Sequence, residues 1–103
     1  MDMYKLIAIY NVPKDIDAFE KHYREVHTPL TKKIPGLEKF LLNRVLGSPQ
    51  GKPTQYVIAE MIFKDLETMD KAMASPEARQ SGKDAYQMAT GGLTLLTVET
   101  LEA

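Results

Sequence analysis

Residues 56–63 read YVIAEMIF, and this run decides the fold. Its β-branched and aromatic side chains predict a strand. Because successive side chains of a strand point to opposite faces of the sheet, Ile58 and Ile62 share one face. The other face receives Val57, Ala59, Met61 and Phe63. Both faces are therefore apolar, and both need a cover of other side chains.

The segments on either side of this strand add three more strands and three helices. Strands are expected over 4–10, 40–46 and 93–101, and helices over 16–30, 66–73 and 76–89. Asp15 or Asp17 can cap the first helix, and Ser75 followed by Pro76 starts the last one. The turn-rich stretch 47–55 forms a hairpin loop. This order predicts an α+β, ferredoxin-like βαββαβ fold with a four-stranded antiparallel sheet.

Length and composition limit the classes of function. The chain has 103 residues, which predicts a single domain over 1–103. Its formal net charge is −1 without a basic block, so nucleic acid is not expected as a partner. It has no cysteine, which excludes disulfides and thiolate chemistry. The apolar runs are too short for a membrane span or a signal sequence, and the expected location is cytoplasmic.

The two-sided apolar strands also predict a partner. The two main helical regions can cover only one face of the sheet, which leaves the second face open. A second copy of the same sheet is the simplest cover, so we expect a homodimer. The alternative is a monomer with a partly apolar exposed face, which carries a risk of aggregation.

Both histidines of the chain lie in the first helix, five residues apart. The apolar stripe of this helix consists of Ile16, Phe19, Tyr23, Val26 and Leu30. At about 100° per residue, His27 lies about 60° from the stripe centre, and His22 about 80° away on the other flank. We therefore expect His27 half-buried beside Tyr23 and His22 at the boundary of the stripe, on its solvated flank. Five residues is also a poor spacing for two metal ligands on one α-helix, so no metal site is predicted.

His27 has two interpretations. Its near-neutral pKa suits a general acid or base. Alternatively, it is a histidine at a helix end that donates to free carbonyl groups. Pro29 bears on both, because a proline inside a helix removes one hydrogen bond and predicts a kink or break near residues 27–28.

Other residues could form a binding site. Glu60 interrupts the apolar strand and is either a site carboxylate or half of an ion pair, for example with Arg44. Tyr10, Tyr23 and Tyr86 each offer a ring and a hydroxyl and could line a pocket, or belong to the core. A stripe of small residues in the last helix either brings the helix close to the sheet or leaves room for a ligand. It consists of Ala78, Gly82, Ala85 and Ala89.

The segment 19–40, FEKHYREVHTPLTKKIPGLEKF, resembles the signature of the EthD family, which is named for a protein linked to bacterial ether degradation. The matching positions are Phe19, Tyr23, His27, Pro29, Leu30, Pro35, Gly36 and Leu37. Downstream, AEMIFKDLETMDKAMASPEA over 59–78 is similar to the family's strand, short helix and Ser-Pro-Glu. Asp84 falls where the family carries an aspartate in its last helix.

The resemblance implies a dimeric α/β-barrel with a small pocket between sheet and helices. It implies roles for His27 and Tyr23 in catalysis, and for Glu60, Phe63 and Asp84 in substrate binding. Similar barrels include isomerases, polyketide cyclases and monooxygenases that need no cofactor, so none is expected here. The expected ligand is a small hydrophobic or aromatic metabolite. The alternative function is a non-catalytic binding or accessory protein in a degradation pathway.

Overall fold

The expected strands pair into one antiparallel sheet in the computed structural model, which describes residues 3–103. They are β1 (Met3–Asn11), β2 (Lys39–Arg44), β3 (Gln55–Phe63) and β4 (Leu93–Thr100). The sheet order is β2-β3-β1-β4, which is the ferredoxin-like arrangement predicted from the sequence. The predicted domain also includes residues 1 and 2, which lie outside the described residues.

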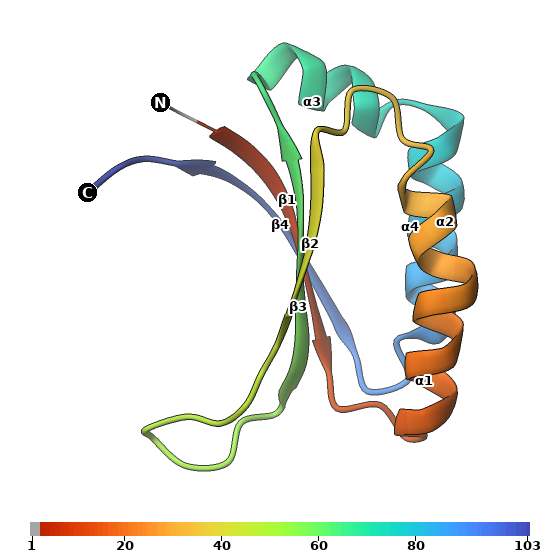
Figure 1. Cartoon of the computed structure of the whole chain (residues 1–103), viewed down its shortest axis with the longest axis vertical. Helices are drawn as coiled ribbons and strands as arrows, with labels where there is room; N and C mark the ends of the chain where they lie inside the picture. The colour runs from red at the N-terminus through yellow and green to blue at the C-terminus, as the bar shows by residue number, and fades with distance from the viewer. Residues whose placement is uncertain (1–2) are drawn as a thin grey trace.

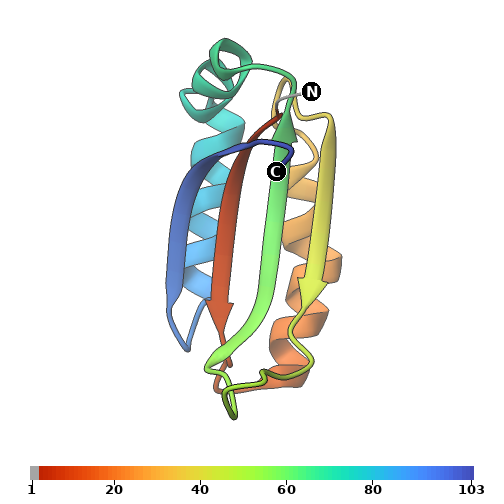
Figure 2. The same cartoon turned by 90° about the vertical axis from the view of Figure 1, so that its left-hand side faces the viewer.

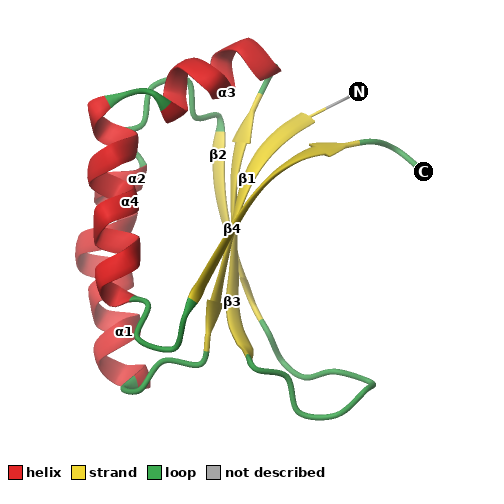
Figure 3. Ribbon diagram, turned by 180° about the vertical axis from the view of Figure 1, so that it is seen from behind, coloured by secondary structure: helices red, strands yellow, loops and turns green. Residues whose placement is uncertain are grey.

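The helices are α1 (Ile16–His22), a π-helical segment η1 (Tyr23–His27), α2 (Thr28–Thr31), α3 (Leu66–Met73) and α4 (Pro76–Met88). Figures 1 and 3 show the column of α1 and α2 beside α4 on one face of the sheet, with α3 across one end. Asp15 caps α1 by accepting the N–H of Ala18 at 3.0 Å. Ser75 caps α4 in the same way, with Pro76 in the first turn, as the sequence predicts.

The core lies between this helical layer and the sheet. Tyr10 of β1 and Phe63 of β3 are among the most buried side chains, at 1% and 0% exposure. Tyr10 meets Phe19 and Tyr23 edge to face, with ring centroids 5.4 and 5.7 Å apart. These aromatic contacts fix the first helix over β1, because a T-shaped ring pair favours one orientation of each ring.

The chain stays helical through Pro29, and the disturbance predicted near residues 27–28 takes the form of a change from the π-helical segment η1 to α2 between His27 and Thr28. Figure 1 shows α1 and α2 as one continuous column. The N–H of Thr28 bonds to the carbonyl of Tyr23, five residues back, instead of the four of an α-helix. Pro29 lies in the first turn of α2, where its missing N–H is tolerated. The proline is accommodated by a wider turn before it.

The other sheet face carries no helix of the described chain, as Figure 2 shows. Leu41 and Leu96 are 44% and 48% exposed there. A polar cluster interrupts this apolar face, because Lys5 Nζ lies 2.8 Å from Glu60 Oε1 and Asn43 Nδ2 lies 2.9 Å from Glu60 Oε2. The pairing of Glu60 with Arg44 considered above is wrong, since Arg44 bonds to Glu20.

The chain leaves the helical layer at Gly36, which has φ = 79°. This left-handed conformation favours glycine, as expected from the Pro-Gly that ends the helix. A Cβ at this position would also lie 2.5 Å from Cγ2 of Thr68 in α3. Gly36 therefore sets both the turn into β2 and the close approach of α3.

Candidate functional site

Two side chains from different helices form the centre of the site. His27 of η1 is 3% exposed, and its Nδ1 lies 2.9 Å from Oδ2 of Asp84 in α4. Because a carboxylate can only accept a hydrogen bond, Nδ1 carries the proton and donates it. The pair therefore holds the ring in the Nδ1–H tautomer, with Nε2 left as an acceptor.

The Nε2 side of the ring faces hydroxyl groups. Thr31, one turn further along the helix, places Oγ1 3.3 Å from Nε2, and the Tyr10 hydroxyl lies 3.5 Å from it. Thr31 Oγ1 is also 2.8 Å from Oγ of Ser81 in α4. Thr31 and Ser81 are 0% and 5% exposed, so this is an enclosed polar cluster within an apolar layer.

The environment keeps the ring neutral and the tyrosine hydroxyls protonated. Burial lowers the pKa of His27, and the hydrogen bond and charge of Asp84 offset only part of that effect. Burial and the charge of Asp84 raise the pKa of Tyr10. Burial and the neighbouring Tyr10 raise the pKa of Tyr23. At neutral pH the site therefore presents a basic nitrogen beside hydroxyl donors.

His22 lies at the solvated flank of the apolar stripe, as expected, with a side chain that is 37% exposed. Its Nε2 also lies 2.8 Å from Oδ1 of Asp84, a contact that the sequence did not predict. Asp84 thus joins both histidines. In an α-helix, residues five apart point about 140° away from each other. The wide turn at Tyr23–His27 changes this, because π-helical bonds span five residues and bring both rings to α4.

A partly open cavity of about 180 Å³ lies between the sheet and the helices. His27, Tyr10 and Ser81 contribute polar groups to its wall. The small side chains of the α4 stripe leave this space open, as one of the two interpretations of that stripe predicts. The apolar wall consists of Leu6, Ala8, Ile34, Met61, Met73, Ala78, Ala85 and Leu95, with Gly82 beside them. A mostly apolar cavity with a few convergent polar groups is typical of a small-molecule site.

Tyr23 lies beside this site rather than on its wall. Its ring centroid is 4.9 Å from that of His27, as the sequence predicts. It lines a separate cavity of about 210 Å³ together with Leu42 and Arg44 of β2. Its buried hydroxyl has no hydrogen-bond partner within the described residues, an arrangement that costs about 1–3 kcal/mol.

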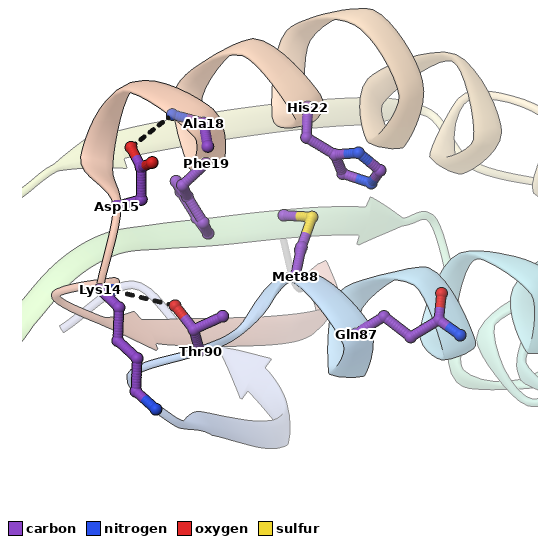
Figure 4. Close-up of a pocket in the computed structure, with 8 residues that line it drawn as sticks. All are labelled: Lys14, Asp15, Ala18, Phe19, His22, Gln87, Met88 and Thr90. Atoms are coloured by element: carbon purple, nitrogen blue, oxygen red, sulfur yellow. Dashed lines mark hydrogen bonds between the residues drawn. The ribbon is translucent and has the colours of Figure 1, made fainter.

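A third space opens on the surface between α1 and the end of α4. This groove has a volume of about 340 Å³. In Figure 4, Phe19 projects into it from α1 and Met88 from α4, and His22 stands at one side. His22 thus lines this surface groove, whereas His27 lines the separate cavity between the sheet and the helices.

Three residues expected at the site lie elsewhere. Glu60 faces the open side of the sheet, where it pairs with Lys5. Phe63 is a fully buried core residue and does not line the cavity. Tyr86 is 65% exposed on the outer side of α4, so its expected place in the pocket is wrong. The buried face of α4 carries Ser81, Ala85 and Met88 instead.

The sequence reasoning missed His22, Thr31 and Ser81. The signal for His22 was the five-residue spacing followed by Pro29, which is compatible with a π-turn. Thr31 follows His27 by four residues, the spacing of neighbours on a helix face. Nothing in the local sequence distinguishes Ser81 from any other helical serine, because its partner lies 50 residues away.

Residues 3–103 contain neither a metal-binding cluster nor a membrane-spanning helix. No group of three or more His, Cys, Asp or Glu side chains is placed to hold a metal ion in this part of the chain. None of its helices is long and apolar enough to cross a membrane.

Comparisons with known proteins agree with the resemblance in the sequence. The EthD domain family matches residues 13–91. An uncharacterized 11.0 kDa protein in the thcB-thcC intergenic region of Rhodococcus erythropolis is 33% identical over 94 residues, which is 91% of each chain. The crystal structure of an ethyl tert-butyl ether d (ethd) family protein from Bacillus halodurans is 44% identical. Its TM-score is 0.90, and the match covers 96% of this chain and 99% of that chain.

More distant structures show the fold alone. A dimeric protein of unknown function and ferredoxin-like fold from Bacteroides fragilis is 16% identical, with a TM-score of 0.64 over 95% of this chain and 96% of that chain. A hydroxynitrile lyase from Passiflora edulis is 13% identical, with a TM-score of 0.77 over 98% of this chain and 95% of that one. With its family signature, its ferredoxin-like sheet and a family match over most of its length, the chain belongs to the EthD family.

Proposed function

We propose that the chain binds a small, mostly apolar metabolite in the 180 Å³ cavity and that His27 moves a proton to or from it without a cofactor. The observation that carries this proposal is the contact of 2.9 Å between Asp84 and Nδ1 of His27. This contact leaves Nε2 unprotonated on the side of Tyr10, a cavity residue. A histidine oriented by a carboxylate is a common form of general base.

The proton transfer follows from the groups around His27. Nε2 takes a proton from an acidic C–H or O–H of the substrate, and the imidazolium that forms is stabilised by the charge of Asp84. Tyr10, protonated at neutral pH, donates a hydrogen bond to the oxygen on which negative charge develops. Isomerisation, cyclisation and reaction with oxygen can all begin with this step.

The cavity wall also indicates the class of ligand. Its volume suits a molecule of roughly one ring, and the wall is mostly aliphatic and methionine. Arg79 is the one cationic side chain among the described wall residues, because His27 is neutral. The guanidinium group of Arg79 donates to the carbonyl of Ala74 at 3.3 Å, and we propose that it turns to pair with a carboxylate on the ligand. Aromatic acids and lactones of this size are therefore the ligands that we propose.

The second candidate function is a binding or accessory protein without catalysis in a degradation pathway. The observation that favours it is the 3% exposure of His27, with hydroxyls of Thr31 and Tyr10 already close to Nε2. A ring held in this way is also compatible with a purely structural role, in which it orders the packing of the core.

One experiment separates the two functions. A panel of aromatic acids and lactones is screened by thermal shift, because a ligand at 100 times its Kd stabilises the native state by about 2.7 kcal/mol. Binders are then incubated in deuterated water, and exchange of their acidic proton is followed by NMR. If His27 is the base, His27→Ala slows exchange by about 10²–10⁴-fold. The matched control, Tyr86→Phe, alters a side chain that is 65% exposed and leaves exchange unchanged. If exchange is absent, or is equally fast in wild type and His27→Ala, the proposed catalytic function fails and the binding function remains.

We further propose that two copies assemble through their open sheet faces. Leu41 and Leu96 are exposed on this face, and apolar patches of this kind typically mark an interface. The Lys5–Glu60 pair would lie within the interface, where it would favour one register of the two sheets. The dimer would resemble the dimeric barrels of the wider superfamily.

A further inference from the structure

His22 occupies an unusual position relative to the proposed base. It does not touch His27 by a hydrogen bond, yet both rings bind the same carboxylate. Oδ1 of Asp84 faces His22 Nε2 at 2.8 Å, and Oδ2 faces His27 Nδ1 at 2.9 Å. The Asp84 side chain is 12% exposed, and its hydrogen bonds within residues 3–103 run to these two rings.

We propose that His22 is a positioning residue for His27, a role that rests on the proposed function of His27 as a base. By donating to Oδ1 it fixes the plane of the Asp84 carboxylate. Oδ2 then stays on Nδ1 of His27 and holds the ring in the Nδ1–H tautomer. The lone pair of Nε2 is thereby kept on the side of Tyr10 and the cavity.

The carboxylate needs this second contact for a simple reason. The terminal torsion of an aspartate has a broad, roughly two-fold profile, so one hydrogen bond alone does not fix its plane. A bond to each oxygen, from opposite directions, removes this rotation. Such outer contacts set the tautomer and orientation of a functional histidine, because the protonated nitrogen follows the available acceptor.

Among the described residues, the Asp84 carboxylate forms its hydrogen bonds with the two histidines and not with the other side chains near His22. The groove beside His22 contains two other charged residues, Lys14 and Asp15. As Figure 4 shows, Asp15 accepts from the N–H of Ala18 at the helix cap, and the backbone N–H of Lys14 donates to Thr90. Asp15 is therefore occupied at the start of α1. Gln87 lines the same groove from α4 and supplies a control.

The choice of substitutions follows from the geometry of the imidazole. The amide nitrogen of glutamine reaches the position of Nε2, so His22→Gln keeps a donor to Asp84 without the imidazole ring. Asparagine is one bond shorter and leaves Oδ1 without this donor. Leucine has a similar bulk to histidine and no donor at all. If His22 only fills space, His22→Leu should behave most like wild type. If His22 positions Asp84, His22→Gln should behave most like wild type.

The test is the ¹⁵N–¹H correlation spectrum of the His27 ring in the free protein at pH 7.5. Wild type is expected to show one tautomer, with Nδ1 protonated. His22→Leu and His22→Asn lose this single state and show a measurable fraction of the Nε2–H form, while His22→Gln restores it. Gln87→Leu keeps the wild-type spectrum. Thermal unfolding of each variant confirms that it is folded, and His22→Asn replaces His22→Leu if the latter does not fold.

The outcomes are distinct from those that test the proposed function. A single Nδ1–H tautomer in both His22→Leu and His22→Asn overturns the positioning role, whatever His27 does. A mixed tautomer in His22→Gln equal to that in His22→Leu overturns it too. If the tautomers shift as expected but His27→Ala leaves proton exchange unchanged, His22 positions His27 and the proposed catalytic function fails.

Discussion

At the scale of single residues, the site is an aspartate in one helix that organises two histidines of another. Asp84 and His27 come from elements that are distant in sequence, and their contact of 2.9 Å lies in a largely buried place. A buried carboxylate is tolerated only where donors satisfy it. The same contact that allows Asp84 to be buried therefore also fixes the orientation of His27.

Removal of the charge of Asp84 tests this interdependence. In Asp84→Asn one amide hydrogen faces a ring N–H, so a donor meets a donor. We expect the free energy of unfolding to fall by about 2–3 kcal/mol, because hydrogen bonds to a charged group contribute about 1.5–3 kcal/mol. Urea denaturation measures the change. Asp70→Asn, on the exposed side of α3, should stay within about 0.5 kcal/mol of wild type, and an equal loss in both variants would contradict the assignment.

The lowered pKa of His27 predicts how stability depends on pH. Burial is the main cause, so the unfolded chain binds a proton at this residue at a higher pH than the folded one. Stability is therefore present above a pH of about 6.5 and falls as the pH is lowered through this value. The slope due to one such group is at most about 1.4 kcal/mol per pH unit.

The comparison that isolates this effect uses His27→Asn, which keeps a donor toward Asp84 and does not titrate. Chemical denaturation at a series of pH values between 5 and 8 should show a smaller slope for His27→Asn than for wild type. His22 and all other side chains are the same in both proteins, so the comparison isolates the change at residue 27. Parallel curves would mean that the folded His27 has an ordinary pKa.

At the scale of elements, the sequence predicted which segments form helices and strands, but not the geometry of the first helix. Apolar spacing located α1, α3, α4 and all four strands, because burial of one face dictates such spacing. The wide turn at Tyr23–His27 leaves no such mark. It depends on contacts of the aromatic rings with the sheet and of both histidines with Asp84, all distant in sequence.

The turn at Gly36 gives a prediction at this scale. Gly36→Ala places a Cβ at φ = 79° and 2.5 Å from Cγ2 of Thr68. We expect a loss of about 1–3 kcal/mol in unfolding free energy, from backbone strain and the displacement of α3. Thermal or urea unfolding measures it. Gly47→Ala is the matched control, since no atom lies within 4 Å of its added Cβ and no positive φ is required.

A second substitution divides the cost into its two parts. Thr68→Ala removes the methyl group that the new Cβ would meet. The double variant should therefore recover part of the stability lost in Gly36→Ala, and the remainder is the backbone strain. If Thr68→Ala recovers nothing, α3 does not approach Gly36 as closely as the structure has it.

At the scale of the whole molecule, the sheet has one face in the core and one without a helical cover. Its apolar character on both sides was evident in YVIAEMIF, which is why the layered architecture could be predicted from sequence. The cavity was one of two interpretations of the small-residue stripe in α4, and the spacing alone could not decide between them. It depends on how far α4 stands from the sheet, and local spacing does not determine this distance.

The open face predicts the effect of a single charge on assembly. Leu96 is 48% exposed on β4, opposite Ile7 of β1. Leu96→Lys would bury a charge in the proposed interface, and we expect it to convert the dimer into folded monomers of 11.6 kDa. Light scattering gives the mass and circular dichroism the fold. Leu46→Lys, at a side chain that is 98% exposed in the hairpin loop, should remain dimeric. A monomeric wild type would contradict the proposed assembly.

The π-turn has a consequence for how this family can vary in length. A turn with one extra residue makes the two halves of a helix differ in rotational phase by about 100°. Loss of a single residue between Tyr23 and His27 would restore one continuous phase and leave the two histidines four residues apart, about 40° apart around an α-helix, so both rings could still face Asp84. What would change is the phase of α1 relative to α2. The extra residue of this turn therefore decides which face of α1 packs on the sheet, and the paired histidines can survive its loss.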